Sequence, residues 1–267
     1  MSDTIDQAVI LAAGLGSRLR KNDSDYLKPL YPLFGKPLVA YVMDALAQIG
    51  VKRFFVVVGF EKQELIPGLQ DALPRETSLE FIDNPDFHLS NGISLLKAAK
   101  IVKGRFILSM CDHLYRHTMV RRLVHGASNK DFLYLAVDRK LSSIFDMDDA
   151  TKVRTEGDKI IDINKKLKKY DAIDTGLFVC PETIFEHLAD VSRTQGGDCS
   201  LSDGVRTMAE TGRSRIVDIG DAFWQDVDTP EMFEHAERWL VKNSPIEISG
   251  LGMSPAVDAS NDQGGTR

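Results

Sequence analysis

The strongest constraint on the fold is a series of short, uninterrupted apolar runs separated by stretches with helical spacing. The runs are Val9–Leu11, Phe54–Val58, Phe106–Met110 and Phe132–Val137. Strands that are apolar on both sides are typical of a parallel sheet covered by helices on both faces. Apolar residues recur at helical intervals between them, for example after Pro37. The alternation predicts right-handed βαβ units and an α/β fold with a doubly wound, mostly parallel sheet.

The pattern changes near residue 150. Two strand-like segments, 151–155 and 159–163, flank the turn sequence Glu156-Gly157-Asp158 and predict a small antiparallel β insertion. A further strand is predicted at 174–180, and helices are predicted at 181–190, 201–211 and 230–242. From Ser244 the chain is rich in Ser, Pro, Gly, Asp and Asn, which predicts a disordered tail over 244–267 behind a domain at 1–243.

Composition limits the class of protein. The 267 residues are 43% hydrophobic and 27% charged, as expected of one globular α/β domain with a real core. The net charge of −6 argues against a nucleic-acid partner, although a local basic pocket can still bind one nucleotide. Cys111, Cys180 and Cys199 form no CxxC pair, so we interpret them as reduced thiols of a cytoplasmic protein. No apolar run approaches the roughly 20 residues of a membrane span.

A glycine-rich turn, Leu11-Ala12-Ala13-Gly14-Leu15-Gly16-Ser17-Arg18, follows the first strand. Glycines let backbone N–H groups approach a phosphate chain, and Arg18 would add charge-assisted bonds. Open α/β sheets bind ligands at this end of a strand. We therefore predict a nucleotide site that includes Leu11, Ala13, Gly14, Gly16 and Ser17, with Arg18 as a catalytic cation.

Two familiar nucleotide motifs are excluded by the residues. A GxGxxG dinucleotide fingerprint requires glycine at position 19, but this residue is Leu19. It also requires an acidic residue at the end of the second strand, and residues 56–60 contain none. A Walker A loop requires a GK[ST] sequence, and none follows Gly14 at the required spacing.

Asp112 directly follows the apolar run 106–111 and would lie beside the phosphate loop. Because Mg²⁺ prefers one or two carboxylates with phosphate oxygens and water, Asp112 is a predicted magnesium ligand.

The fuller pattern resembles the sugar-phosphate nucleotidyltransferase superfamily. The resemblance rests on LAAGLGSR, then Leu27-Lys28-Pro29-Leu30, then Gly35-Lys36-Pro37-Leu38. It implies a Rossmann-like nucleotidyltransferase fold in which Lys28 reaches the phosphates of the nucleotide and of the acceptor. The sequence Trp224-Gln225-Asp226-Val227-Asp228-Thr229-Pro230-Glu231 resembles the element that supplies the second metal ligand. We favour Asp226 over Asp228, because Asp228 is also a candidate N-cap for the following helix.

Three further stretches resemble inositol-1-phosphate cytidylyltransferases, which make CDP-inositol from CTP. They are Ser90–Leu96, Met110–Tyr115, and Asp149–Val153 with Ile173–Phe178. The resemblance covers 8–240 and implies that Asn91, Gly92 and Ser94 lie against the base. His113 is a candidate general base, but an acceptor phosphate is already anionic and needs none.

The acceptor side is less constrained by the sequence. Asp174 is the predicted reader of polyol hydroxyl groups. Within the basic run at Lys165, Lys166, Lys168 and Lys169, we assign Lys166 to the acceptor phosphate, although a solvated face is the ordinary role of such a run.

The expected partners are CTP, Mg²⁺ and a small phosphorylated alcohol, with no nucleic acid and no membrane span. The family also occurs fused to a membrane-embedded transferase, so a separate transferase that uses the product is a candidate partner, as is a second copy of the chain in a homodimer. Other acceptors stay open, namely phosphocholine, a phosphonate or a sugar 1-phosphate. A nucleotide-sensing domain without turnover is the alternative from another class, but Lys28, Asp112 and Asp226 are all present.

Overall fold

The computed structural model describes residues 5–16 and 26–243, and its centre is a nine-stranded mixed sheet. Seven strands run in one direction, and β10 and β11 run against them. The strands in spatial order are β5 (Ser78–Asp83), β4 (Arg53–Val58), β1 (Gln7–Ala12), β6 (Phe106–Met110), β11 (Ala172–Cys180), β8 (Leu133–Asp138), β12 (Ser214–Asp218), β10 (Lys159–Asn164) and β9 (Lys152–Glu156).

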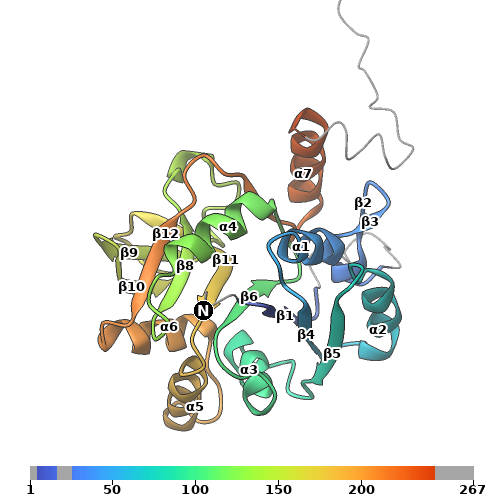
Figure 1. Cartoon of the computed structure of the whole chain (residues 1–267). Helices are drawn as coiled ribbons and strands as arrows, with labels where there is room; N and C mark the ends of the chain where they lie inside the picture. Colours follow the sequence, from blue (N-terminus) through green and yellow to red (C-terminus); the bar gives the residue numbers. More distant parts are fainter. Residues whose placement is uncertain (1–4, 17–25, 244–267) are drawn as a thin grey trace, which may run out of the picture.

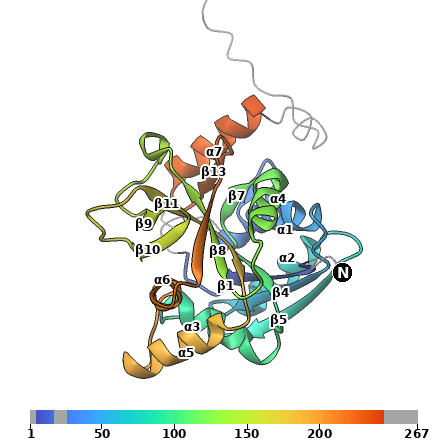
Figure 2. The same ribbon diagram turned by 60° about the vertical axis from the view of Figure 1, so that its left-hand side comes forward.

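Helices cover both faces of the sheet, as the apolar runs predict. Figures 1 and 2 show α3 (Asn91–Leu96), α5 (Ile184–Thr194) and α6 (Leu201–Glu210) on one face, and α1 (Leu38–Ala47) and α4 (His117–Gly126) on the other. Alternate residues of β1 enter different cores: Ile10 packs in the cluster with α1 and α4, and Val9 in the cluster with α3, α5 and α6. Burial on both faces explains why these strands read as continuous apolar runs.

Smaller elements lie beside the main sheet. The remaining helices are α2 (Lys62–Asp71) and α7 (Pro230–Asn243), with 3₁₀ turns η2 (Lys28–Leu30), η3 (Lys97–Lys100) and η4 (Leu141–Ser143). Two ribbons complete the structure: β2 (Pro32–Leu33) pairs with β3 (Lys36–Pro37), and β7 (His113–Tyr115) pairs with β13 (Trp224–Asp226). None of the helices in the described ranges is long and apolar enough to cross a membrane.

The sequence predictions of fold are confirmed for the α/β class, for the central strands and for the hairpin, which is β9–β10. The predicted helices at 181–190, 201–211 and 230–242 correspond to α5, α6 and α7. The strand predicted at 174–180 is β11, which runs antiparallel between β6 and β8. The tail at 244–267 lies outside the described residues.

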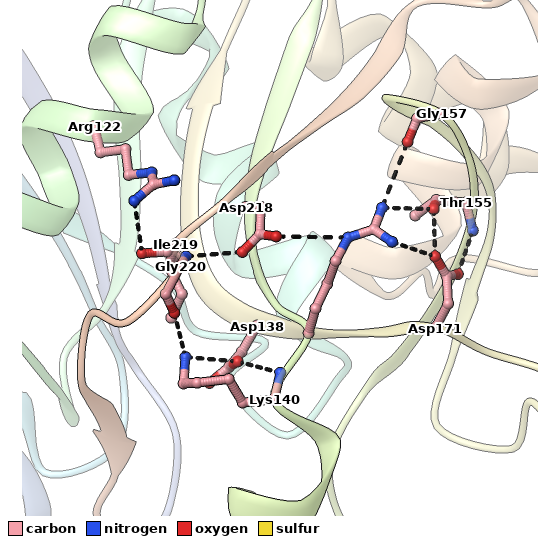
Figure 3. A network of polar contacts seen from close by, with 10 residues as sticks. Arg122, Asp138, Lys140, Thr155, Gly157, Asp171, Asp218, Ile219 and Gly220 are labelled. Carbon is pink, nitrogen blue, oxygen red and sulfur yellow. Dashed lines mark hydrogen bonds and ion pairs between the residues drawn. The ribbon is translucent and has the colours of Figure 1, made fainter.

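A polar hub at Arg139 ties the hairpin to the sheet. Its guanidinium donates to Asp171 Oδ2 at 2.9 Å and to Thr155 Oγ1 at 3.0 Å, and its Nε lies 3.8 Å from Asp218 Oδ2. Figure 3 shows Asp171, Thr155, Gly157 and Asp218 gathered around this point. Strands β9 and β12 and the residue that precedes β11, Asp171, therefore share one planar cation that follows β8.

We expect Arg139→Met to loosen the β9–β10 hairpin because methionine offers no hydrogen-bond donor to these oxygens. Each charge-assisted bond contributes about 1–2 kcal/mol when partly exposed. Amide hydrogen exchange in 152–164 should accelerate at least about fivefold, a change of about 1 kcal/mol. Arg193→Met, at an exposed arginine paired only with Asp190 among the contacts of the described residues, is the matched control. Unchanged exchange in the hairpin would contradict the role of Arg139.

Candidate active site

A cavity of about 800 Å³ opens at the carboxyl ends of the central strands. Its wall includes the ends of β1, β6 and β8 and the first half of antiparallel β11, which all reach the same edge of the sheet. Ligands of open α/β sheets bind at this edge, and the volume lies in the range of small-molecule sites, about 300–1,000 Å³. The cavity is therefore the candidate active site.

The glycine-rich turn forms one side of the cavity. Four of the residues predicted to bind the nucleotide line it, namely Leu11, Ala13, Gly14 and Gly16. Gly16 has φ +57°, and a Cβ there would lie 2.7 Å from Cβ of Lys28. Glycine is thus required both by the backbone conformation and by the lysine stem that packs under the turn. Ser17 and Arg18 lie outside the described residues, so their assigned roles stay predictions.

Lys28 lies between two carboxylates at the base of the cavity. Its ammonium forms ion pairs with Asp112 Oδ2 and Asp228 Oδ1, and all three side chains are at most 16% exposed. Burial alone would lower the pKa of Lys28, but the two negative charges outweigh it and raise the pKa above its usual value. Burial likewise opposes ionisation of Asp112, yet Lys28 and a hydrogen bond from His113 hold the pKa of Asp112 well below its usual range. The cluster carries a net charge of −1 with all three groups ionised.

The β7–β13 ribbon brings the two carboxylates together. Trp224 pairs with Tyr115 and Asp226 with His113, and the ladder continues through a 3.0 Å bond from Val227 N to Asp112 O. Asp112 precedes one strand of the ribbon and Asp228 follows the other. The antiparallel register therefore places both residues at the same end of the ribbon, above Lys28.

The second carboxylate that pairs with Lys28 is Asp228, whereas the sequence analysis favours Asp226 as the second metal ligand. Asp226 lies opposite His113 in the ribbon, and its Oδ1 accepts a 3.1 Å bond from Gln225 Nε2. Burial raises the pKa of Asp226. Thr229 supplies the side-chain cap of α7, since its Oγ1 accepts from Met232 N at 3.3 Å. The capping role considered for Asp228 thus belongs to Thr229, and the Asp228 carboxylate is turned to the lysine.

The donor set at this point fits a divalent cation. Asp112 and Asp228 already converge on one positive charge, and Mg²⁺ is held by one or two carboxylates with phosphate oxygens and water. Across 5–16 and 26–243, no group of three or more His, Cys, Asp and Glu side chains is arranged to hold a metal. Substrate phosphates would therefore have to supply part of the coordination.

Of the three residues predicted to touch the base, two line the cavity and one does not. Asn91 and Ser94 line the cavity, while Gly92 does not. Asn91 Oδ1 accepts from Leu201 N at 2.8 Å, which joins α3 to the start of α6, and Ser94 Oγ accepts from buried Asn84 at 2.9 Å. A Cβ at Gly92 would lie 2.6 Å from the carbonyl oxygen of Cys199. Gly92 therefore allows close packing of these segments.

Of the two residues predicted to bind the acceptor, one lines the cavity and the other does not. Asp174 lines the cavity, and its Oδ1 accepts from Gly176 N at 2.7 Å. Burial raises the pKa of Asp174 to about 6. Lys166 is exposed and absent from the cavity wall, whereas its neighbour Lys165 lines the wall and pairs with Asp149 at 2.6 Å.

Sequence reasoning missed a second polar wall. Asp138 ends β8 as Asp112 follows β6, and this repeated strand-end carboxylate was the available signal. Asp138 is 3% exposed, and it accepts from Lys140 Nζ at 2.8 Å and from Trp224 Nε1 at 3.0 Å. All three residues line the cavity.

Comparison with known proteins assigns the family. Residues 8–205 match the model of the MobA-like NTP transferase domain. The chain belongs to this family. The match spans β1, the glycine-rich turn, Lys28 and Asp112, so an NTP transferase domain accounts for most of the cavity.

Two relatives are similar over most of the domain. The bifunctional IPC transferase and DIPP synthase of Thermococcus kodakarensis is 35% identical over 248 residues, which are 92% of this chain and 52% of the relative. The protein with the same name from Aquifex aeolicus is 34% identical over 93% of this chain and 54% of its own. The NTP transferase chain thus spans about half the length of these relatives.

A solved structure covers nearly the whole domain. The inositol-1-phosphate CTP transferase from T. maritima superposes with a TM-score of 0.78 and 26% identity, over 95% of this chain and 99% of that one. This similarity confirms the nucleotidyltransferase fold expected from the sequence.

We expect Asp174→Asn to stabilise the NTP transferase domain at neutral pH. The raised pKa means that stability is full below the ordinary value of 3.8 and is lost as pH rises through about 6, where the buried carboxyl ionises. Asparagine keeps an acceptor for Gly176 N and carries no charge. The gain should reach at most about 3 kcal/mol above pH 7 and vanish near pH 4.

Urea unfolding at pH 4 and pH 8 measures this difference, with the exposed Asp190→Asn as control. A variant that is equally destabilised at both pH values would show that Asp174 carries no desolvated charge.

Proposed function

We propose that this NTP transferase domain transfers CMP from CTP to inositol 1-phosphate, releasing pyrophosphate and forming CDP-inositol. The observation that carries the proposal is the Lys28–Asp112–Asp228 cluster beneath the glycine-rich turn, in a chain that matches the T. maritima inositol-1-phosphate CTP transferase over 95% of its length. The IPC transferases that resemble it at 34–35% identity support the same acceptor.

The reaction is an in-line displacement at the α-phosphorus of CTP. An oxygen of the acceptor phosphate forms a bond to this phosphorus, and the bond to the bridging oxygen of the β-phosphate breaks, so that pyrophosphate leaves with the electron pair. No proton has to be removed from the acceptor, because its phosphate is anionic at neutral pH. Catalysis then consists of positioning and charge stabilisation.

Each part of the proposed active site has a defined task in this scheme. Lys28, held rigidly before Pro29, offers a positive charge to the phosphates. Asp112 and Asp228 would hold Mg²⁺, which when bound neutralises triphosphate charge. The outer wall, with Asp174 and Lys165, would receive the acceptor, and Asn91 with Ser94 would face the base. The glycine-rich turn would present backbone N–H groups to the nucleotide, with Arg18 as a second cation.

The second metal ligand is tested by comparing two carboxamides. We expect Asp228→Asn to raise the half-saturating Mg²⁺ concentration and lower kcat at least about a hundredfold, a loss of about 2.7 kcal/mol, as for Asp112→Asn. Asp226→Asn should have a smaller effect because, within residues 26–243, Lys28 forms its ion pairs with Asp112 and Asp228 and forms none with Asp226. The exposed Asp71→Asn serves as control. A larger effect at Asp226 than at Asp228 would reverse the assignment.

Substrate choice is tested by pyrophosphate release from four nucleoside triphosphates with a panel of phosphorylated acceptors. A site that accepts a hydrogen bond from the 4-amino group of cytosine leaves that acceptor unpaired with UTP, which costs about 1–3 kcal/mol. We therefore expect kcat/KM about ten- to a hundredfold higher with CTP than with UTP. Inositol 1-phosphate should be preferred to hexose 1-phosphates, and Asp174→Asn should reduce its use more than it reduces CTP binding.

Equal or better kcat/KM with phosphocholine or glucose 1-phosphate would assign another acceptor while leaving nucleotidyl transfer intact. Binding of CTP without any pyrophosphate release would instead favour a nucleotide-sensing domain. A membrane transferase that uses the product and a homodimer stay predictions.

A further inference from the structure

His113 lines the cavity, and its imidazole ring contacts three residues around it. Its Nδ1 lies 2.7 Å from Asp112 Oδ1. One face of the ring stacks on Trp224, with centroids 5.9 Å apart and planes 19° apart. A Cβ at Gly176, which has φ +70°, would lie 2.6 Å from His113 Nε2. Glycine at 176 therefore leaves room for the imidazole ring, where any other residue would place its Cβ against Nε2.

The bond to Asp112 has a definite direction. Asp112 forms an ion pair with the ammonium of Lys28 through its Oδ2, and a carboxylate in such an ion pair can only accept hydrogen bonds. Nδ1 of His113 must therefore donate. This bond occupies Oδ1 of Asp112, and the other oxygen, Oδ2, is the one that contacts Lys28.

Trp224 is anchored in turn by a buried carboxylate. Its Nε1 donates to Asp138 Oδ2 at 3.0 Å, while Asp138 Oδ1 accepts from the backbone N and the Nζ of Lys140 at 2.7 and 2.8 Å. Lys140 Nζ also donates to Gly220 O at 2.6 Å. Figure 3 shows Lys140 between Asp138 and Gly220. Both oxygens of Asp138 thus accept hydrogen bonds, and the indole is joined to the end of β8.

We propose that Asp138, Trp224 and His113 form a positioning chain that orients Asp112, turning its Oδ2 toward the nucleotide phosphates and their metal. The inference rests on the proposed function for the role of Asp112, and none of the three residues is assigned to bind substrate. A carboxylate ligand held by an outer hydrogen bond loses orientation when that bond is removed, and such losses are typically about 10–100-fold in metal affinity or activity.

The first experiment needs neither metal nor substrate. With ¹⁵N-labelled histidine, the Nδ1–H proton of His113 is followed by NMR in the metal-free full chain. We expect a slowly exchanging proton in the wild type and at least about tenfold faster exchange in Trp224→Phe, which keeps an aromatic face and loses the bond to Asp138. Trp239→Phe is the matched control, because Trp239 lines the same cavity but stacks on Phe223. Equal exchange rates of the His113 proton in the wild type and in Trp224→Phe would overturn the proposed positioning chain.

The second experiment separates positioning from general stability. His113→Asn retains a donor near the position of Nδ1, whereas His113→Leu does not. We expect His113→Leu to raise half-saturating Mg²⁺ and lower kcat about 10–100-fold with KM for the acceptor within about twofold, and His113→Asn to recover much of the loss. The exposed His125→Gln controls for the loss of a histidine. Normal kcat and Mg²⁺ dependence in His113→Leu, or equal losses in the asparagine and leucine variants, would overturn the proposal.

The two arms also separate this proposal from the proposed function. A wild-type protein that forms no product from CTP and inositol 1-phosphate, but shows the coupled exchange of the His113 proton, would refute the proposed substrates and support the chain. Normal turnover, together with a His113 proton whose exchange rate is the same in the wild type and in Trp224→Phe, would support the proposed substrates and refute the positioning chain.

Discussion

The ammonium of Lys28 between the carboxylates of Asp112 and Asp228 is the interaction on which the rest of the site depends. Three charges that are at most 16% exposed can persist only because they compensate one another, since each desolvated ion alone costs several kcal/mol. Removal of the lysine would leave two carboxylates facing each other. The arrangement is therefore preformed for a nucleotide and its cation. The ammonium offers positive charge to the phosphates, and the two carboxylates offer negative charge to the cation.

The backbone explains how residues so distant in sequence reach this point. Lys28 follows the glycine-rich turn, Asp112 follows β6, and Asp228 arrives through the β7–β13 ribbon. Gly16 packs on the lysine stem, and the hydrogen bond from Val227 N to Asp112 O fixes the ribbon. A disturbance in any of these three segments would change the separation of the same charges. The family match and the similarity to the T. maritima transferase are consistent with a geometry built for nucleotidyl transfer.

Local patterns predicted the fold well because burial on both faces leaves a clear trace in the sequence. The runs at 54–58 and 106–110 are β4 and β6, and the turn at 156–158 joins β9 to β10. The direction of β11 was not predictable in this way, since an apolar strand reads alike in parallel and antiparallel pairing. The position of Asp112 on the cavity wall follows from its place directly after a strand. A local pattern cannot decide which of Asp226 and Asp228 reaches Lys28, because the register of a distant ribbon decides it. Nor does it reveal the wall that is assembled from Asp138, Lys140 and Trp224.

The central claim is that this cluster supports transfer of CMP to a phosphorylated cyclitol. The most direct measurement is ³¹P NMR of CTP, inositol 1-phosphate and MgCl₂ with the wild-type protein, with Lys28→Met in parallel. The account predicts equimolar growth of pyrophosphate and of the coupled pair of resonances of a diphosphate diester, and no such growth with Lys28→Met. Unchanged CTP, hydrolysis of CTP without a diester, or equal product from Lys28→Met would contradict it.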